Sequence, residues 1–135
     1  MIRLHSSSWH GEGGLFNVTA RGTNASVMLD VSHAPVESRL VLNARAMGAR
    51  ADVVLHPTFE GLYLIESAHA GSAKLHERKG VEDPSGRGRK RSVDMFNWRN
   101  KRLVGYVGWS SSSDELVSPW GGAVVESDEA ASLTV

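Results

Sequence analysis

The sequence predicts an all-β fold of about nine or ten short strands, arranged as a β-sandwich or as a short β-solenoid of stacked hairpin repeats. Apolar and polar residues alternate along much of the chain, which is the pattern of strands with one buried face. Turn-forming Gly, Pro, Asn and Asp residues recur roughly every 8 to 12 residues and separate these stretches. No window of about a dozen residues keeps apolar residues at helical spacing without an intervening Gly or Pro.

The clearest alternation lies in the first third of the chain. Between residues 27 and 31, and again between residues 40 and 46, every second residue is apolar, so each stretch predicts a strand with one face in the core. Residues 53–55 are apolar throughout and predict a strand buried on both faces. The other expected strands span, in chain order, residues 15–20, 62–66, 73–76, 93–98, 103–109, 123–126 and 132–135.

A weak internal repeat appears when the chain is shifted by 22 residues. The repeated unit is a strand, a proline turn and a second strand, and such units can stack as a solenoid or form duplicated hairpins in a sandwich. Both alternatives remain open at this point. The shift places Val31 on Val53, Pro35 on Pro57, Leu40 on Leu62, Leu42 on Leu64 and Ala46 on Ala68.

Length and composition indicate one globular domain spanning residues 1–135, with residues 1–14 and 110–122 as candidate flexible or loop segments. The absence of cysteine excludes disulfides, thiolate metal sites and a cysteine nucleophile. No stretch approaches the roughly 20 apolar residues of a membrane span, and the first residues lack the apolar core of a signal peptide. We therefore expect a cytoplasmic protein with no membrane partner.

The zero net charge conceals a strong asymmetry. Residues 78–102 contain nine basic and three acidic residues and therefore carry a net charge of +6. The rest of the chain contains six basic and twelve acidic residues. Such segregation suits a polyanionic partner, but it can also join two subunits. A homo-oligomer whose association weakens with salt is one expectation.

The basic segment supplies the candidate ligand-binding residues Arg87, Arg89, Arg91, Trp98 and Trp109. Guanidinium groups neutralise phosphates, and interleaved aromatic rings stack on exposed bases, so residues 87–102 suit a nucleic acid or another polyanion. The alternative interpretation is a solvated loop and edge strand, in which Lys and Arg discourage edge-to-edge pairing.

Other chemistries have weaker support in the sequence. Four tryptophans suffice for a lectin-like surface that stacks on a sugar ring. None of the six histidines pairs with another at the i, i+2 spacing of metal ligands on one strand face, so we expect no metal site and no cofactor. Motifs for nucleophilic hydrolysis and for dinucleotide binding are absent. A small enzyme would need a histidine and a carboxylate brought together in a pocket by folding.

Four motifs occur in a fixed order between Ser26 and Trp109. In that order they resemble an uncharacterised fungal family of adhesin-like β domains, a domain of unknown function. The resemblance implies a stacked-β fold and carries no assigned activity, so it transfers no catalytic residue. The motifs are Ser32-His33-Ala34-Pro35-Val36, Leu55-His56-Pro57-Thr58-Phe59-Glu60-Gly61, Asp83-Pro84-Ser85-Gly86-Arg87-Gly88-Arg89 and Gly105-Tyr106-Val107-Gly108-Trp109.

Strand rhythm, charge segregation and the lack of a coherent catalytic motif together favour a non-catalytic β-rich binding or self-assembly domain. The alternatives are a lectin-like carbohydrate-binding module, a small enzyme with a histidine and carboxylate pocket in a β scaffold, and a polyanion or nucleic-acid binder that uses residues 87–102.

Overall fold

The chain folds into two layers of β-sheet. The computed structural model describes residues 2–5, 14–31, 33–35, 38–99, 101–110 and 121–135. Within those residues it contains eleven strands and no helix, which confirms the predicted all-β class. Each of the ten strands expected from the alternation is present, and the eleventh is β1 (Ile2–His5).

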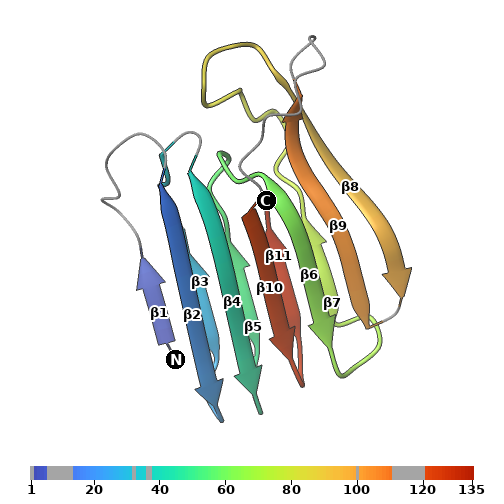
Figure 1. The fold of residues 1–135 in the computed structure, drawn as a ribbon. Coiled ribbons are helices and arrows are strands. Elements are labelled where there is room, and N and C mark those ends of the chain that lie inside the picture. Colours follow the sequence, from blue (N-terminus) through green and yellow to red (C-terminus); the bar gives the residue numbers. More distant parts are fainter. Residues whose placement is uncertain (1, 6–13, 32, 36–37, 100, 111–120) are drawn as a thin grey trace.

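Six strands form the sheet nearest the viewer in Figure 1, here called the front sheet. Its first four strands are parallel to one another, and the last two continue it as an antiparallel hairpin. Across the sheet the order is β2 (Leu15–Thr23), β4 (Arg39–Met47), β10 (Gly121–Ser127), β6 (Gly61–Ser67), β9 (Arg102–Ser110) and β8 (Lys90–Arg99).

Five shorter strands form the back sheet, in which all neighbours are parallel. The chain alternates between the layers, so that β2 leads to β3, β4 to β5, β6 to β7 and β10 to β11. Across the back sheet the order is β1, β3 (Val27–Asp30), β5 (Ala51–Val54), β11 (Ala131–Thr134) and β7 (Ala73–His76).

The last two strands of the chain, β10 and β11, lie in the interior of the two sheets rather than at their edges. Strand β10 pairs with β4 on one side and with β6 on the other, and β11 lies between β5 and β7 in the same way. The close approach at Gly61 and Gly121, which face each other at the start of β6 and β10, requires glycine. A Cβ on Gly61 would collide with the carbonyl of Gly121, and Gly61 has a φ of 151°, which disfavours other residues.

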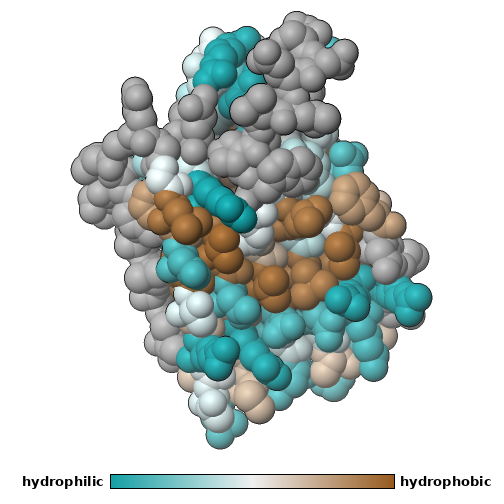
Figure 2. Space-filling model, in the orientation of Figure 1, coloured by the Kyte–Doolittle hydropathy of each residue, from teal (hydrophilic) through white to brown (hydrophobic). Residues whose placement is uncertain are grey.

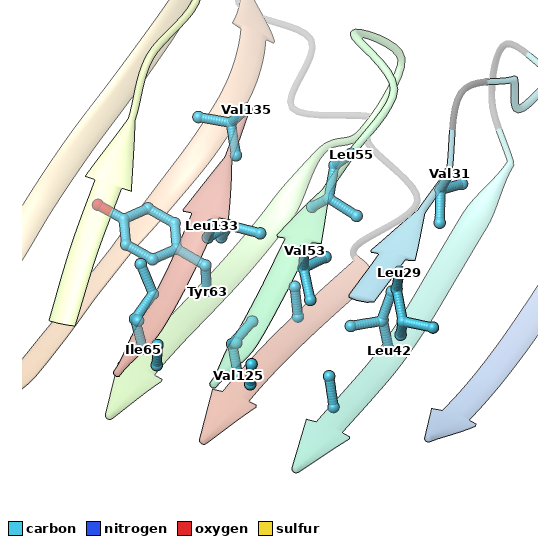
Figure 3. Packing of buried hydrophobic residues seen from close by; sticks show 14 of the residues in the cluster. Leu29, Val31, Leu42, Val53, Leu55, Tyr63, Ile65, Val125, Leu133 and Val135 are labelled. Carbon is cyan, nitrogen blue, oxygen red and sulfur yellow. The ribbon is translucent and has the colours of Figure 1, made fainter. Parts of the chain in front are cut away.

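One apolar core fills the space between the two sheets (Figure 3). Because successive side chains of a strand point to opposite faces, the inward residues of β4, such as Leu42, meet those of the back sheet, such as Leu29 and Val53. Tyr63 and Ile65 of β6 extend the core toward β11. All five side chains are fully buried, so the interior of the described residues is tightly filled.

Two predictions about the strands were wrong in detail. Strand β5 is buried on one face only, because Val54 points to the outside of the back sheet, where no described strand covers it. The shift of 22 residues pairs Leu40, which is 4% exposed, with Leu62, which is 49% exposed. Leu42 and Tyr63 both pair with Ala123 of β10, so the structure relates residues that are 21 apart. The predicted shift is one residue too long, and an error of one residue places a side chain on the opposite face of the sheet.

The outer face of the front sheet carries an apolar band across its middle, with hydrophilic residues below it (Figure 2). Leu62 and Tyr106 are cross-strand partners, and Leu64 and Val104 form the next outward row. One row further along, charges replace apolar groups. That row reads Arg21, Arg45, Glu126, Glu66, Arg102 and Arg99 across the six strands.

Most of the two candidate loop segments lies outside the described residues, which omit 6–13 and 111–120. At their described ends, Ile2–His5 form β1, and Gly121 and Gly122 begin β10. No helix in the described ranges has the length and apolar character needed to cross a membrane.

Candidate functional site

The start of β8 and the end of β9 bring together three of the five predicted ligand-binding residues. Arg91 and Trp109 are direct cross-strand partners in the β8–β9 hairpin, and Arg89 immediately precedes β8. Two acidic residues join them: Asp83 from the loop just before β8, and Glu60 from a distant part of the chain. We call this group the arginine–tryptophan cluster; it consists of Glu60, Asp83, Arg89, Arg91 and Trp109.

Trp109 is the fixed centre of the cluster. Its backbone N–H donates to Glu60 Oε1 at 2.9 Å, and its indole Nε1–H donates to the carbonyl of Pro57 at 2.8 Å. The guanidinium carbons of Arg89 and Arg91 lie 5.8 and 5.9 Å from the centre of the ring, within the range of cation–π attraction. The ring is buried, so it serves as a platform for the two arginines rather than as an exposed stacking surface.

Arg89 is held by two carboxylates. Its Nε and Nη2 donate to the two oxygens of Asp83 at 3.2 and 3.0 Å, which is the paired geometry that guanidinium and carboxylate favour. Its Nη1 lies 3.5 Å from Glu60 Oε1. The Arg89 side chain is 13% exposed and that of Asp83 is 4% exposed, so this charge is satisfied inside the protein.

Asp83 also organises the loop that precedes β8. Its carboxylate accepts the backbone N–H groups of Ser85 and Arg89, both at 2.9 Å, and the Ser85 hydroxyl at 2.8 Å. The Gly86 N–H donates to the Asp83 carbonyl and closes the turn predicted from the Asp-Pro-Ser-Gly sequence. The Arg89 guanidinium, together with these N–H and hydroxyl donors, holds the pKa of Asp83 well below its usual range, although burial acts in the opposite direction.

Arg91 has far fewer partners than Arg89. Its Nη1 donates weakly to the Arg78 carbonyl at 3.4 Å, and its buried Nε has no hydrogen-bond acceptor. No carboxylate in the described part of the chain lies within ion-pair distance of it. Burial lowers the pKa of Arg91, while Glu77 and Arg78 act on it in opposite directions. The guanidinium nevertheless stays charged, because its ordinary pKa is above 12.

A groove of about 470 Å³ lies beside Arg91. The loop that joins β7 to β8 forms one wall, and the end of the β8–β9 hairpin forms the other. Of the described residues that line it, five are basic and one is acidic, so they give it a positive potential. The residues that line it are Glu77, Arg78, Lys79, Gly80, Val81, Arg89, Lys90, Arg91 and Trp109.

The other two predicted residues lie apart from this groove. Arg87 is exposed in the loop before β8 and does not line the groove. Trp98 lies in β8 seven residues beyond Arg91, roughly 23 Å along the strand at 3.3 Å per residue. Its side chain is outside the described part of the structure. Trp9 and Trp120 also fall outside the described residues, so the lectin-like alternative has no described tryptophan on an open face.

Sequence reasoning missed Glu60, Asp83, Arg78 and Lys79 as parts of this site. The Asp-Pro-Ser-Gly turn was a usable signal for Asp83, because aspartate at the first position of such a turn accepts the following backbone N–H groups. Arg78 and Lys79 were visible only as part of the basic segment. Glu60 had no local signal, since it reaches Trp109 from a point 49 residues away in the chain.

His56 packs in a turn beside the groove loop. Its Nδ1 accepts the Thr58 N–H at 3.2 Å and lies 2.9 Å from the Thr58 hydroxyl oxygen. Its ring stacks on that of His33, with centroids 6.1 Å apart. Burial, followed by the charges of His33 and Arg78, lowers the pKa of His56. In the described ranges no group of three metal-ligating side chains converges, and the hydrogen-bond partner of His56 is threonine rather than a carboxylate.

This lowered pKa predicts that mild acid destabilises the fold. The unfolded chain binds a proton at His56 near pH 6.5, whereas the folded chain does so only at lower pH, so unfolding takes up a proton as the pH falls below about 6.5. The free energy of unfolding, measured by urea titration, should therefore decrease between pH 7 and pH 5. His56→Asn should make this decrease shallower. Equal slopes for both proteins would contradict the assignment.

Comparison of the chain with protein-family models, with curated proteins and with solved structures found no match.

Proposed function

We propose that this chain is a non-catalytic β domain that binds a polyanion through the groove beside Arg91. The ligand class is a polymer that carries phosphate or sulfate groups, recognised by charge and by guanidinium hydrogen bonds rather than by base stacking. The observation that carries the proposal is the unpartnered, buried Nε–H of Arg91 at a groove whose other basic residues include Arg78 and Lys79.

A buried donor without an acceptor costs free energy, and native proteins leave few of them. A small rotation of the Arg91 side chain toward the groove would let a bound anion supply the missing acceptor. The anion would also balance a positive charge that no carboxylate within ion-pair distance balances in the described residues. Arg89 is not available for this role, because Asp83 and Glu60 already occupy its donors. Arg89 instead braces Trp109, on which Arg91 rests.

The same contacts support a passive binding role. The described residues that line the groove include no histidine and only one carboxylate, Glu77, so they offer no pair suited to acid–base catalysis. Base stacking needs an exposed ring, and Trp109 is buried. A site made of Arg78 and Lys79 in the loop before β8 and of Arg91 on the β8–β9 hairpin instead fits sequence-independent recognition of a charged backbone.

We also propose that the two layers are a short β-solenoid. Each of the four pairs of successive front and back strands makes one coil, and the coils stack by parallel pairing. This arrangement accords with the stacked-β fold implied by the resemblance to fungal adhesin-like domains. The β8–β9 hairpin extends the front sheet beyond the last coil and so carries the groove at one end of the stack.

Retention on immobilised heparin and on immobilised polyphosphate tests the binding proposal. With three contacts to anionic groups, from Arg78, Lys79 and Arg91, the log of the binding constant should fall with log salt with a slope of about −2. Lys79→Glu should lower the salt concentration needed for elution from both resins. Retention on both resins indicates recognition of charge, whereas retention on one indicates which anionic group is preferred.

Lys74→Glu is the matched control, because it makes the same charge change at an exposed residue on β7 that does not line the groove. Arg91→Lys is the sharper variant, since it keeps the charge and removes the Nε–H donor. We expect Arg91→Lys to elute earlier than the unmodified chain and Lys74→Glu to elute close to it. Equal effects of Lys79→Glu and Lys74→Glu would show that retention reflects overall charge, and the groove proposal would then be wrong.

A further inference from the structure

The two sheets end unevenly at the end of the stack opposite the β8–β9 hairpin. The front sheet ends at β2, and β3 lies behind β2 in the back sheet. The back sheet continues one strand further, because β1 pairs with β3 on its outer side. The back layer therefore projects past the front layer by the width of one strand, as the left side of Figure 1 shows.

No described strand pairs with the edge of β2 that faces away from β4. In the described structure β2 pairs with β4 alone. Gly14 accepts the N–H of Arg39 at 2.8 Å, and the N–H of Asn24 donates to Met47, so even-numbered residues face β4. In a parallel pair alternate residues bond to alternate sides, so the odd-numbered residues present N–H and C=O groups to the open side. These residues are Leu15, Asn17, Thr19, Arg21 and Thr23.

The core is also incompletely covered at this end. Phe16, Val18 and Ala20 of β2 point inward yet stay partly exposed, whereas Leu42 and Ala44 of the neighbouring β4 are fully buried. One more strand beside β2 would cover the inward side chains of β2 as β2 covers those of β4.

The opposite edge of the front sheet is protected. Strand β8 carries three basic residues besides Asp94, and its register with β9 shifts between Met95 and Asn97. Charges and bulges of this kind prevent strand addition. Within the described residues, β2 has Arg21 as its one charged residue and a register with β4 that has no shift.

The uneven end is self-complementary. A two-fold rotation about an axis parallel to the strands exchanges front and back layers and places the projecting β1 of a second copy in the open position beside β2. The reciprocal contact forms at the same time, with β1 of the first copy beside β2 of the second. Strands β1 and β2 run in opposite directions (Figure 1), so both junctions are antiparallel. Pairing β2 directly with its own symmetry copy is blocked, because β1 would collide with β3 of the second copy.

We propose that two copies of this chain associate at this end, with β2 of each paired to β1 of the other. The contact is isologous and closes as a dimer. Strand β1 has four residues and β2 has nine, so pairing covers the half of β2 that contains Thr19, Arg21 and Thr23. Because backbone groups make the junction, its association should persist at high salt, unlike an assembly of oppositely charged segments.

Sedimentation velocity over a range of concentrations tests the proposal, with Thr19→Pro as the disrupting variant. Proline at this position removes an N–H that faces the open side and keeps the bonds to β4. Thr19→Val is the matched control, because it keeps the N–H and the branched side chain. We expect a dimer for the unmodified chain and for Thr19→Val at low and high salt, and a monomer for Thr19→Pro. A monomer at every concentration would overturn the proposal.

If Thr19→Pro fails to fold, a pair of introduced cysteines tests the same junction between β2 of one copy and β1 of the other. The chain has no cysteine, so Arg21→Cys combined in turn with Arg3→Cys and with Leu4→Cys introduces thiols only in β2 and β1. Within one molecule these strands lie in different layers, roughly 10 Å apart, which is too far for a disulfide. Oxidation should link two chains for at least one of the pairs. Failure of both pairs to cross-link would contradict the junction, and polyanion retention at the distant groove is independent of either result.

Discussion

Gly61→Ala is expected to destabilise the protein by about 3 kcal/mol or more, because two separate costs meet at one residue. A Cβ on Gly61 would collide with the backbone carbonyl of Gly121, and backbone cannot move aside as a flexible side chain can. The φ of 151° adds strain for any residue other than glycine. Gly61 and Gly121 pair at the start of β6 and β10, so the collision can be relieved only if these two strands move apart.

Gly122→Ala is the control for this substitution. It lies one residue along β10 on the outward side, and a Cβ there would meet no atom within 4 Å. Alanine also restricts the unfolded chain, so we expect Gly122→Ala to be neutral or stabilising by up to about 1 kcal/mol. Urea denaturation monitored by circular dichroism measures the free energy of unfolding of both variants. Similar midpoints for the two variants would contradict the close packing of β6 against β10.

Asp83→Ala is expected to cost about 3 to 5 kcal/mol at pH 7, because it leaves the guanidinium of Arg89 without its main partner in a nearly buried position. It also removes the acceptor of the backbone N–H groups of Ser85 and Arg89. The pH dependence gives an independent signature. The pKa of Asp83 is lowered in the folded chain, so its stabilisation is complete above the unfolded pKa of about 4 and is lost as the pH falls below that value.

The difference in unfolding free energy between Asp83→Ala and the unmodified chain should therefore shrink as the pH is lowered from 4 toward 2. Glu66→Ala is the control, because Glu66 and Arg102 form an ion pair in which both side chains are about half exposed. We expect a change of less than about 1 kcal/mol there. A cost for Asp83→Ala no larger than that for Glu66→Ala would show that the cluster does not brace the groove.

The sequence predicted the strands well because the period of two and the turn residues are local signals. All ten expected strands are present, from β2 to β11. Strand β1 was missed because Ile2–His5 is short and its neighbour β3 is distant in the chain. Strand order was not predictable. The insertion of β10 between β4 and β6 depends on contacts such as that of Gly121 with Gly61, which no local pattern encodes.

In the candidate site too, local sequence signals predicted some residues, and only the fold revealed the others. Arg91 and Trp109 meet because they lie on one hairpin, so a local interpretation of the basic segment could find them. The sequence did not distinguish Arg89, whose charge is satisfied internally, from Arg91, which forms no ion pair with a described carboxylate. That distinction depends on Glu60 and on the fold of the loop around Asp83. Sequence reasoning also treated Trp109 as a ligand-stacking candidate, whereas the fold places it beneath two arginines.

The most direct test of the binding proposal is the NMR signal of the Arg91 Nε–H group during titration with inorganic tripolyphosphate. Because this Nε is buried, its proton should exchange slowly enough to be seen, and Arg91→Lys assigns it by its loss. We predict a saturable shift of this signal at low salt, with little change at Arg45, whose Nε lies 3.9 Å from Glu126 on the front sheet. An Arg91 signal that stays in place while the exposed arginines shift would contradict a specific anion site in the groove.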